Sequence, residues 1–418
     1  MKPLFRIVAL LVLLTLVSQF FRVAYGAIAP DLLRDLGLSA TSLSLAGGAF
    51  FLGLGLAQVP VGMAFDRIGV RRTVAALTIV AVIGAIGNAL ARDAAELIAA
   101  RLVIGIGCGG SFMGAVVLTA RWAPADRYAL VLSWVFALSN LGTLMAGTPL
   151  ALLTEAVGWR NSFLVIAAIS GVVGVIFYLG ARDAPPGAAP LPASRETLGE
   201  ILRGLGSVLG ARGLGQTFAI HSVAYAAIVT LLGLWAGPYL QHVHGLDTIA
   251  RGNVILAMAV GQIAGIFAYG PLDRLIGRRK PIIIAGAVAA AGALVALAFL
   301  PADLRFGSYA LLIAFCLIGA YSVVIVAHGR SLFPPSLLGR GVTTVNLAQV
   351  AGAFALPYLS GLIVQWISPD GAPYPVEAYR AVFLLLALSL VVGAAIFALG
   401  PDSGPRFAAV QTAKSSSA

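Results

Sequence analysis

Residues 62–72 read GMAFDRIGVRR and separate two long apolar runs of the chain. A second copy, GPLDRLIGRRK, occupies residues 270–280 and again stands between two apolar runs. The Asp66-Arg67 pair of the first copy recurs as Asp273-Arg274, 207 positions later. Each copy places a carboxylate beside arginines at the end of a hydrophobic segment. The two stretches therefore indicate a chain built from two related halves.

The repeat continues on both sides of these stretches. At shifts of 206 to 220 positions, Pro30 recurs as Pro238, Gly37 as Gly245, Leu38 as Leu246, Asn140 as Asn346, Pro149 as Pro357 and Arg160 as Arg380. Two halves in the same orientation are typical of secondary transporters, which bind their substrate between the halves near the middle of the membrane. We therefore expect two six-helix halves, residues 1–181 and 214–403.

The composition indicates a membrane protein. Of the 418 residues, 60% are hydrophobic and 10% are charged, and the mean hydropathy is +0.98. Soluble domains carry about 25% charged residues, so an ordinary soluble enzyme is excluded. An apolar run of about 20 residues can cross a bilayer as a helix. The chain has twelve such runs, at roughly 7–29, 42–64, 73–91, 95–119, 128–152, 161–181, 214–240, 250–271, 281–300, 308–329, 342–366 and 380–400. The sequence thus predicts an all-α polytopic membrane protein with twelve transmembrane helices.

The first run has an alternative interpretation as a signal peptide. Lys2 and Arg6 precede it, and Ala27-Ile28-Ala29 resembles a cleavage site. The repeat favours a retained helix, because the second half has a counterpart of this segment.

The positions of Lys and Arg predict the orientation. With the N-terminus inside, the cytoplasmic segments hold 19 of them and the outer loops hold six. Because basic residues favour cytoplasmic loops, we expect both termini in the cytoplasm, at a bacterial inner membrane. The same clustering accounts for the net charge of +11 without nucleic-acid binding. Residues 182–213 are expected to form a cytoplasmic linker with an amphipathic helix near 197–209, or else a plain flexible linker, and residues 404–418 a disordered tail.

The two repeated loops resemble the signature loop of the major facilitator superfamily. The resemblance covers essentially the whole chain, because the loop, the repeat and the number of spans agree. It implies alternating access, with a gate formed by Gly62, Asp66, Arg67, Gly69 and Arg71 in the first copy and by Asp273, Arg274, Gly277 and Arg278 in the second. An ordinary cluster of cytoplasmic arginines is the alternative, but it does not explain the placed glycines and aspartates.

Arg101 begins a sequence, RLVIGIG, that resembles a second motif of the same family, R-x-x-Q-G-x-G. In proton-coupled members this arginine is associated with coupling, which makes Arg101 a candidate coupling residue. Ile104 stands where glutamine is usual, so a structural arginine that donates to neighbouring carbonyls is an equal alternative. The glycine-rich motif of drug antiporters is not met in the fifth span, which makes drug export the second choice.

Arg22 lies within the first span, where a charge is costly unless it lines a cavity or pathway. Thr15, Ser18, Gln19, Tyr25 and Gly26 share its helical face. The surrounding segment resembles the first helix of anion permeases of the superfamily, and the resemblance implies that Arg22 contacts the substrate. The alternative is a structural arginine that extends toward the membrane surface or binds a carbonyl.

The acidic residues favour an anionic substrate. All sixteen fall in predicted loops or at the ends of spans, so none is placed to neutralise Arg22. A buried cation without a carboxylate is best satisfied by an anion. The same distribution leaves His221, His328 or the acid group of the substrate itself as candidates for proton coupling, and for His221 a hydrogen-bonded helix histidine is the alternative.

Neutral polar side chains inside the spans complete the predicted binding site. They are Gln19, Tyr25, Asn140, Tyr225, Gln262, Asn346 and Gln349, and the repeat suggests that Asn140 faces Asn346 across the cavity. Such side chains also join helices by hydrogen bonds, which is the alternative role for each of them.

The sequence therefore predicts a monomeric secondary transporter of a small organic anion, such as a carboxylate or sugar acid, with protons as one option for the coupling ion. No metal, nucleotide or other cofactor is expected, and no enzymatic activity, because mid-span positions carry no catalytic cluster. Two alternatives remain open: a proton-driven exporter of drugs or hydrophobic compounds, and a membrane sensor of the same fold that does not transport.

Overall fold

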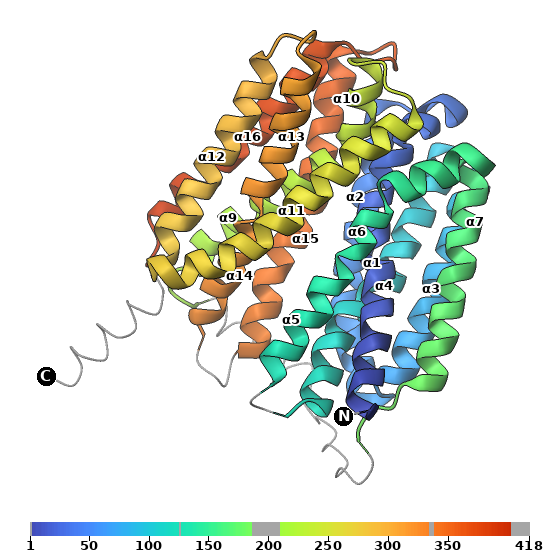
Figure 1. Cartoon of the computed structure of the whole chain (residues 1–418), viewed down its shortest axis with the longest axis vertical. Coiled ribbons are helices and arrows are strands. Elements are labelled where there is room, and N and C mark those ends of the chain that lie inside the picture. The colour runs from blue at the N-terminus through green and yellow to red at the C-terminus, as the bar shows by residue number, and fades with distance from the viewer. Residues whose placement is uncertain (1, 125–126, 186–209, 334–337, 403–418) are drawn as a thin grey trace, which may run out of the picture.

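The computed structural model describes residues 2–124, 127–185, 210–333 and 338–402, and within these ranges every regular element is a helix. Most of the long helices run side by side from one end of the molecule to the other (Figure 1). The first half contains α1 (Lys2–Leu36), α2 (Ala40–Arg67), α3 (Val70–Leu90), α4 (Ala94–Trp122), α5 (Tyr128–Ser139), α6 (Leu141–Met145) and α7 (Thr148–Gly180). The second half contains α9 (Leu214–Thr230), the π-helical turn η1 (Leu231–Trp235), α10 (Ala236–His242), α11 (Thr248–Ile276), α12 (Arg279–Phe299), α13 (Arg305–Gly319), α14 (Ser322–Ser331), α15 (Leu338–Ile367) and α16 (Val376–Ala398).

Eleven segments of the described chain are long and apolar enough to cross a membrane. One of them, Leu130–Gly180, has 51 residues. At about 1.5 Å per residue it would span roughly 75 Å, more than twice the hydrocarbon thickness. It is interrupted at Gly158, where a non-helical φ of +80° kinks α7. Divided at this kink, the segment overlaps the predicted spans 128–152 and 161–181.

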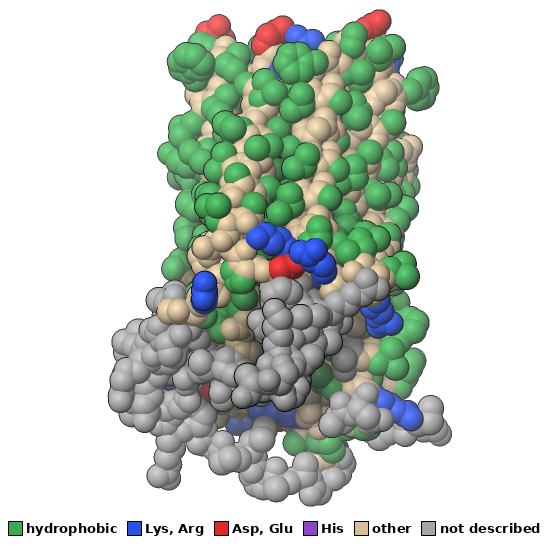
Figure 2. Space-filling view, turned by 90° about the vertical axis from the view of Figure 1, so that its left-hand side faces the viewer, with side chains coloured by type: hydrophobic (Ala, Val, Ile, Leu, Met, Phe, Trp, Pro, Cys, Tyr) green, Lys and Arg blue, Asp and Glu red, His purple; other side chains and the backbone are tan. Residues whose placement is uncertain are grey.

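The outer surface agrees with a lipid environment. Figure 2 shows a broad band of hydrophobic side chains, with charged side chains gathered toward its two ends. An apolar surface this extensive is unfavourable in water and favourable in lipid, so the protein is an integral membrane protein.

The sequence repeat has a structural counterpart in two turns. Gly37 and Gly245 adopt the left-handed backbone conformation, with φ of +58° and +67°. Two residues later, Ser39 and Asp247 accept hydrogen bonds from the first turns of α2 and α11 through their side chains. A repeated glycine turn followed by a repeated helix cap explains why both helices begin at corresponding positions.

Helix α1 is an integral part of the bundle. At Gly26 a Cβ atom would lie 2.7 Å from the carbonyl carbon of Gly233 in η1, so only glycine permits this close crossing. The crossing fixes the rotation of α1 and hence the direction in which Arg22 points. The predicted amphipathic helix near 197–209 and the tail 404–418 lie outside the described residues.

Candidate functional site

A cavity of about 1010 Å³ lies between the helices of the two halves. Side chains from α1, α4, α5 and α6 line one side, and side chains from α9, η1, α11, α12, α14 and α15 line the other. The cavity extends to Arg330 and Ser331, which are exposed at the end of α14. This is the end of the bundle at which α1 begins and α16 ends (Figure 1). The structure is therefore open toward the side of the termini.

Arg22 extends from α1 into this cavity. Its Nη1 donates a 3.3 Å hydrogen bond to the Tyr225 hydroxyl of α9. Its Nε is buried and has no hydrogen-bond partner within the described part of the chain. No Asp or Glu side chain is among the described residues that line the cavity. The cavity thus presents a positive charge whose hydrogen bonding is incomplete.

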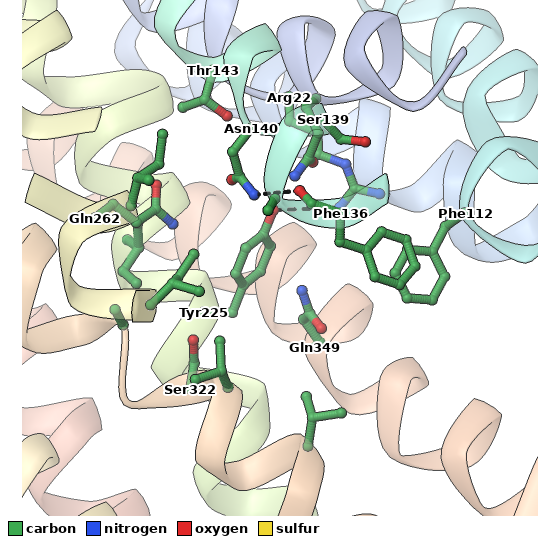
Figure 3. A pocket seen from close by; sticks show the side chains of 18 of the residues that line it. Arg22, Phe112, Phe136, Ser139, Asn140, Thr143, Tyr225, Gln262, Ser322 and Gln349 are labelled. Carbon is green, nitrogen blue, oxygen red and sulfur yellow. Dashed lines mark hydrogen bonds between the residues drawn. The ribbon is translucent and has the colours of Figure 1, made fainter. Parts of the chain in front are cut away.

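Most of the predicted polar set surrounds Arg22 (Figure 3). The residues that line the cavity as predicted are Gln19, Asn140, Tyr225, Gln262 and Gln349. The Asn140 amide Nδ2 donates to the Phe136 carbonyl at 2.8 Å, one turn earlier, so part of its hydrogen bonding is used within its own helix. These residues come from α1, α9, α11, α15 and the short segment between α5 and α6.

Tyr25 and Asn346 do not line the cavity, contrary to the prediction. Tyr25 is fully buried, and its hydroxyl donates to the Leu43 carbonyl of α2 at 3.1 Å. The hydrogen bond to α2 holds the Tyr25 side chain away from the cavity, and Asn346 is absent from the described cavity lining. Asn140 and Asn346 therefore do not face each other across it.

His221 reaches the cavity from α9 with 1% of its surface exposed. Gln349 lies beside it, but neither ring nitrogen makes a hydrogen bond of normal geometry to a described residue. Tyr225, one helical turn later, holds Arg22. The structure therefore groups His221 with the predicted binding residues.

Arg101 is fully buried and lies outside the cavity lining. Its Nη1 donates to the Phe21 carbonyl of α1 at 3.2 Å, and its Nε donates to the Ala46 carbonyl of α2 at 3.3 Å. The guanidinium group also lies 4.7 Å from the ring centroid of Tyr25. These contacts match the structural alternative considered for Arg101, and they join α4 to α1 and α2.

The first repeated loop is held by a carboxylate that the motif does not contain. Asp183 accepts a 2.7 Å hydrogen bond from the Arg71 backbone amide. Gly69 has a φ of +91°, and a Cβ there would lie 2.5 Å from Asp183 Oδ2, so this position requires glycine. Asp66 and Arg67 are exposed, and Asp66 forms no ion pair with any described residue. At Gly62 a Cβ would meet only Met113, at an ordinary 3.9 Å.

The second repeated loop is held by one carboxylate outside the motif and by one within it. Asp402 accepts from the Lys280 backbone amide at 3.0 Å and pairs with Arg278 at 2.9 Å, which repeats the arrangement of Asp183. Asp273 pairs with Arg279 at 3.2 Å. Gly277 ends α11 in the left-handed conformation, and Arg274 is exposed. Asp183 and Asp402 were not predicted, although their separation of 219 residues nearly equals that of Arg160 and Arg380.

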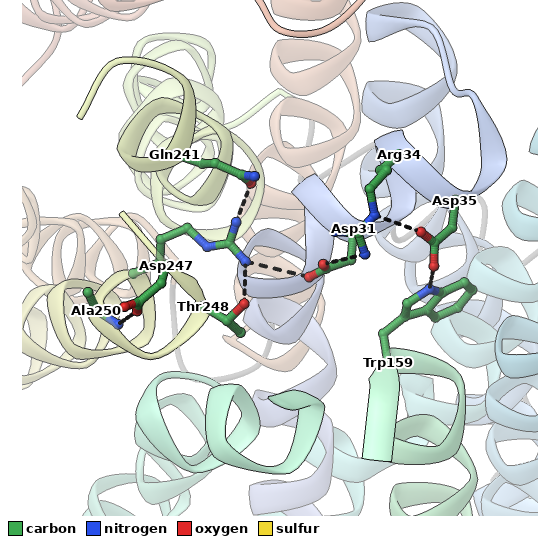
Figure 4. A network of polar contacts seen from close by, with 9 residues as sticks. Asp31, Arg34, Asp35, Trp159, Gln241, Asp247, Thr248 and Ala250 are labelled. Atoms are coloured by element: carbon green, nitrogen blue, oxygen red, sulfur yellow. Dashed lines mark hydrogen bonds and ion pairs between the residues drawn. The ribbon is translucent and has the colours of Figure 1, made fainter. Parts of the chain in front are cut away.

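The opposite end of the bundle is closed by a polar network that joins the halves (Figure 4). Arg251 of α11 has 3% of its side chain exposed and lies 3.5 Å from the Asp31 carboxylate of α1. It also bonds to Gln241 and, at 3.2 Å, to the Thr248 hydroxyl. Arg34 contacts Asp31 from the solvent side at 3.2 Å. We name the Asp31–Arg251 contact the outer latch. Its two residues were predicted only as loop residues.

The chain is similar to known membrane transporters along most of its length. The family model described as Major Facilitator Superfamily matches residues 11–327 and 252–415. A protein of Agrobacterium vitis named as a candidate tartrate transporter is 25% identical over 436 residues, which cover 98% of this chain and 97% of that protein. A gallate transporter of Pseudomonas putida is 29% identical over 162 residues, covering 38% of this chain and 35% of that protein.

Among solved structures, a bacterial homolog of the human lysosomal transporter Spinster, in an inward-facing and unoccupied conformation, has the same fold. The TM-score is 0.74 at 19% identity, and the match covers 95% of this chain and 96% of that one. Together with the family match, the predicted helical architecture is confirmed. The chain belongs to the Major Facilitator Superfamily of membrane transporters.

Proposed function

We propose that the protein is a secondary transporter that carries a small organic anion, such as a carboxylate or sugar acid, by alternating access. The observation that carries the proposal is Arg22, whose buried Nε has no hydrogen-bond partner in the described part of the chain and whose cavity has no acidic side chain among its described lining residues. A buried charge is costly unless it is paired, and a guanidinium group binds a carboxylate through two parallel hydrogen bonds. An anionic substrate supplies both the opposite charge and the acceptors for these hydrogen bonds.

The relatives support the same class of substrate. Tartrate and gallate, which appear in their names, are both carboxylates. The Lys and Arg distribution favours a cytoplasmic location for the open end, at a bacterial inner membrane. The structure then corresponds to an inward-open state of a monomeric transporter, in which the outer latch closes the other side.

For coupling we favour protons, with His221 as the carrier. Among the described lining residues His221 is the side chain whose type ordinarily titrates closest to neutral pH. Arg101 keeps its charge under these conditions, and its hydrogen bonds are made to carbonyls. We therefore favour a structural role for Arg101, in which it holds α1 in place, over a role in proton coupling.

The proposed function is tested with purified protein in liposomes. Counterflow is measured for a panel of carboxylates and for the corresponding neutral amides, which have nearly the same shape. We expect exchange of at least one carboxylate and only background exchange of every amide, because an amide cannot compensate the charge of Arg22. Equal exchange of carboxylates and amides would favour the alternative of an exporter for hydrophobic compounds.

The gate assignment predicts an effect on turnover rather than on binding. Asp66 is exposed and forms no ion pair with a described residue in this open state, so Asp66→Asn should leave the affinity of this state for substrate unchanged. It should slow turnover by about tenfold, because a charge-assisted hydrogen bond of roughly 1.5–3 kcal/mol is lost when the side of the termini closes. Equilibrium binding and counterflow rates are compared in the same preparation. Weakened binding with normal turnover would contradict the assignment.

A further inference from the structure

The cavity has an aromatic wall that the proposed function does not use. Phe112 of α4 and Phe136 of α5 stack with their ring centroids 4.5 Å apart and an interplanar angle of 9°. Both rings line the cavity, and Phe112 is 45% exposed. Figure 3 shows this ring pair and the guanidinium group of Arg22 on the same side of the cavity, with Gln262 on the opposite side. An apolar ring surface therefore adjoins the anion-binding group.

The charges of the cavity favour a single carboxylate near this wall. Three arginines line the cavity among the described residues: Arg22, Arg279 and Arg330. Arg279 is paired with Asp273 and also donates to the Ala327 carbonyl at 3.0 Å. Arg330 is exposed near the end of α14. Arg22 thus remains as the cation available in the interior, and the second carboxylate of a dianion would lack a partner there.

We propose that the transported anion is an aromatic monocarboxylate, whose carboxylate binds Arg22 while its ring packs against the Phe112–Phe136 pair. The inference rests on the proposed function, because it uses the same arginine. Aromatic rings stack favourably in offset or edge-on arrangements, whereas a hydroxylated aliphatic acid would leave the exposed face of Phe112 uncovered. The amides of Gln19 and Gln349 in the same cavity offer hydrogen bonds to a hydroxyl group on the ring.

The test compares ligands that differ in aromaticity but share charge and hydroxyl group. Binding of 4-hydroxybenzoate, 4-hydroxycyclohexanecarboxylate and tartrate to the purified full-length protein is measured by calorimetry. We expect 4-hydroxybenzoate to bind about tenfold more tightly than its saturated analogue, and tartrate to bind more weakly than both. If the wild type binds the saturated analogue or tartrate at least as tightly as 4-hydroxybenzoate, the inference is overturned.

A matched pair of variants tests whether the preference for the aromatic ligand comes from the Phe112–Phe136 pair. Phe112→Leu keeps an apolar side chain but removes the ring, and it should abolish the preference for 4-hydroxybenzoate without changing the affinity for the saturated analogue. Phe267→Leu is the control, because Phe267 lines the same cavity from α11 and is not part of the ring pair. Preservation of the preference in Phe112→Leu, or an equal loss in Phe267→Leu, would contradict the assigned wall.

The same measurements separate this inference from the proposed function. Binding of aliphatic carboxylates that depends on Arg22 but shows no aromatic preference would refute the inference and leave anion transport intact. If no carboxylate binds in a manner that depends on Arg22, the proposed function itself fails. The melting temperature of each variant is measured to confirm that it is folded, and the wild-type ligand series decides the preference without any substitution.

Discussion

The variant Arg22→Gln is expected to lower carboxylate transport by about 100-fold. Glutamine retains a donor near Tyr225 but loses the positive charge and the planar pair of donors that a carboxylate requires. A hydrogen bond to a charged group contributes about 1.5–3 kcal/mol, and 1.4 kcal/mol corresponds to a factor of ten. The loss of both bonds therefore accounts for roughly two orders of magnitude. Initial counterflow rates over a range of substrate concentrations measure the effect.

Two further measurements make this result specific. Arg22→Lys keeps the charge without the planar geometry, so it should lie between wild type and Arg22→Gln. The melting temperature of Arg22→Gln without substrate should equal or exceed that of wild type, because the substitution removes a buried Nε that has no partner within the described residues. Wild-type rates in Arg22→Gln, or a matching loss for a neutral substrate, would refute the role of the charge.

The variant Arg251→Gln is expected to open the outer end of the protein. Removal of one partner of a buried ion pair costs about 3–5 kcal/mol, so loss of the outer latch should shift the equilibrium toward the outward-open state by about 100-fold or more. A cysteine introduced by Thr143→Cys, in a background without Cys108 and Cys316, reports access to the cavity. Its reaction with an impermeant maleimide from the side of Asp31 should become much faster.

Arg34→Gln is the matched control for the outer latch. Arg34 contacts the same Asp31 carboxylate at 3.2 Å, but 70% of its side chain is exposed. Exposed ion pairs contribute about 0–1 kcal/mol, so labelling should change at most fivefold. The exchanged pair Asp31→Arg with Arg251→Asp should restore part of the wild-type labelling. If Arg34→Gln and Arg251→Gln have the same effect, the latch is not the element that closes this end.

The helices could be predicted closely because a bilayer fixes the length and apolar character of each span. The predicted run 42–64 lies within Ala40–Arg67, and the run 281–300 nearly coincides with Arg279–Phe299. Arg22 could be found for the same reason, since a charge in hydrocarbon requires a compensating environment. The rules that identify these positions concern single segments, and they need no knowledge of how the helices pack.

The remainder of the site depends on helix packing, which a local pattern does not encode. Tyr25 shares the predicted face of Arg22, yet the glycine crossing at Gly26 turns it toward α2. Phe112 and Phe136 resemble the many lipid-facing phenylalanines of the sequence until α4 and α5 are placed beside the cavity. Asp31 and Arg251 belong to different halves, and no motif connects them. The aromatic wall and the outer latch were therefore visible only in the assembled structure.

The hydrogen bond between Arg22 and Tyr225 has a consequence for the energetics of the transport cycle. Arg101 fastens the backbone beside Arg22 to α2 and α4, whereas Tyr225 belongs to α9. A hinge motion of one half against the other must stretch this hydrogen bond inside the cavity, and a bound carboxylate can replace it by bridging the same two side chains. The bound substrate would then link the two halves in place of this hydrogen bond. The empty and the loaded protein therefore differ in how rigidly their halves are connected at the cavity.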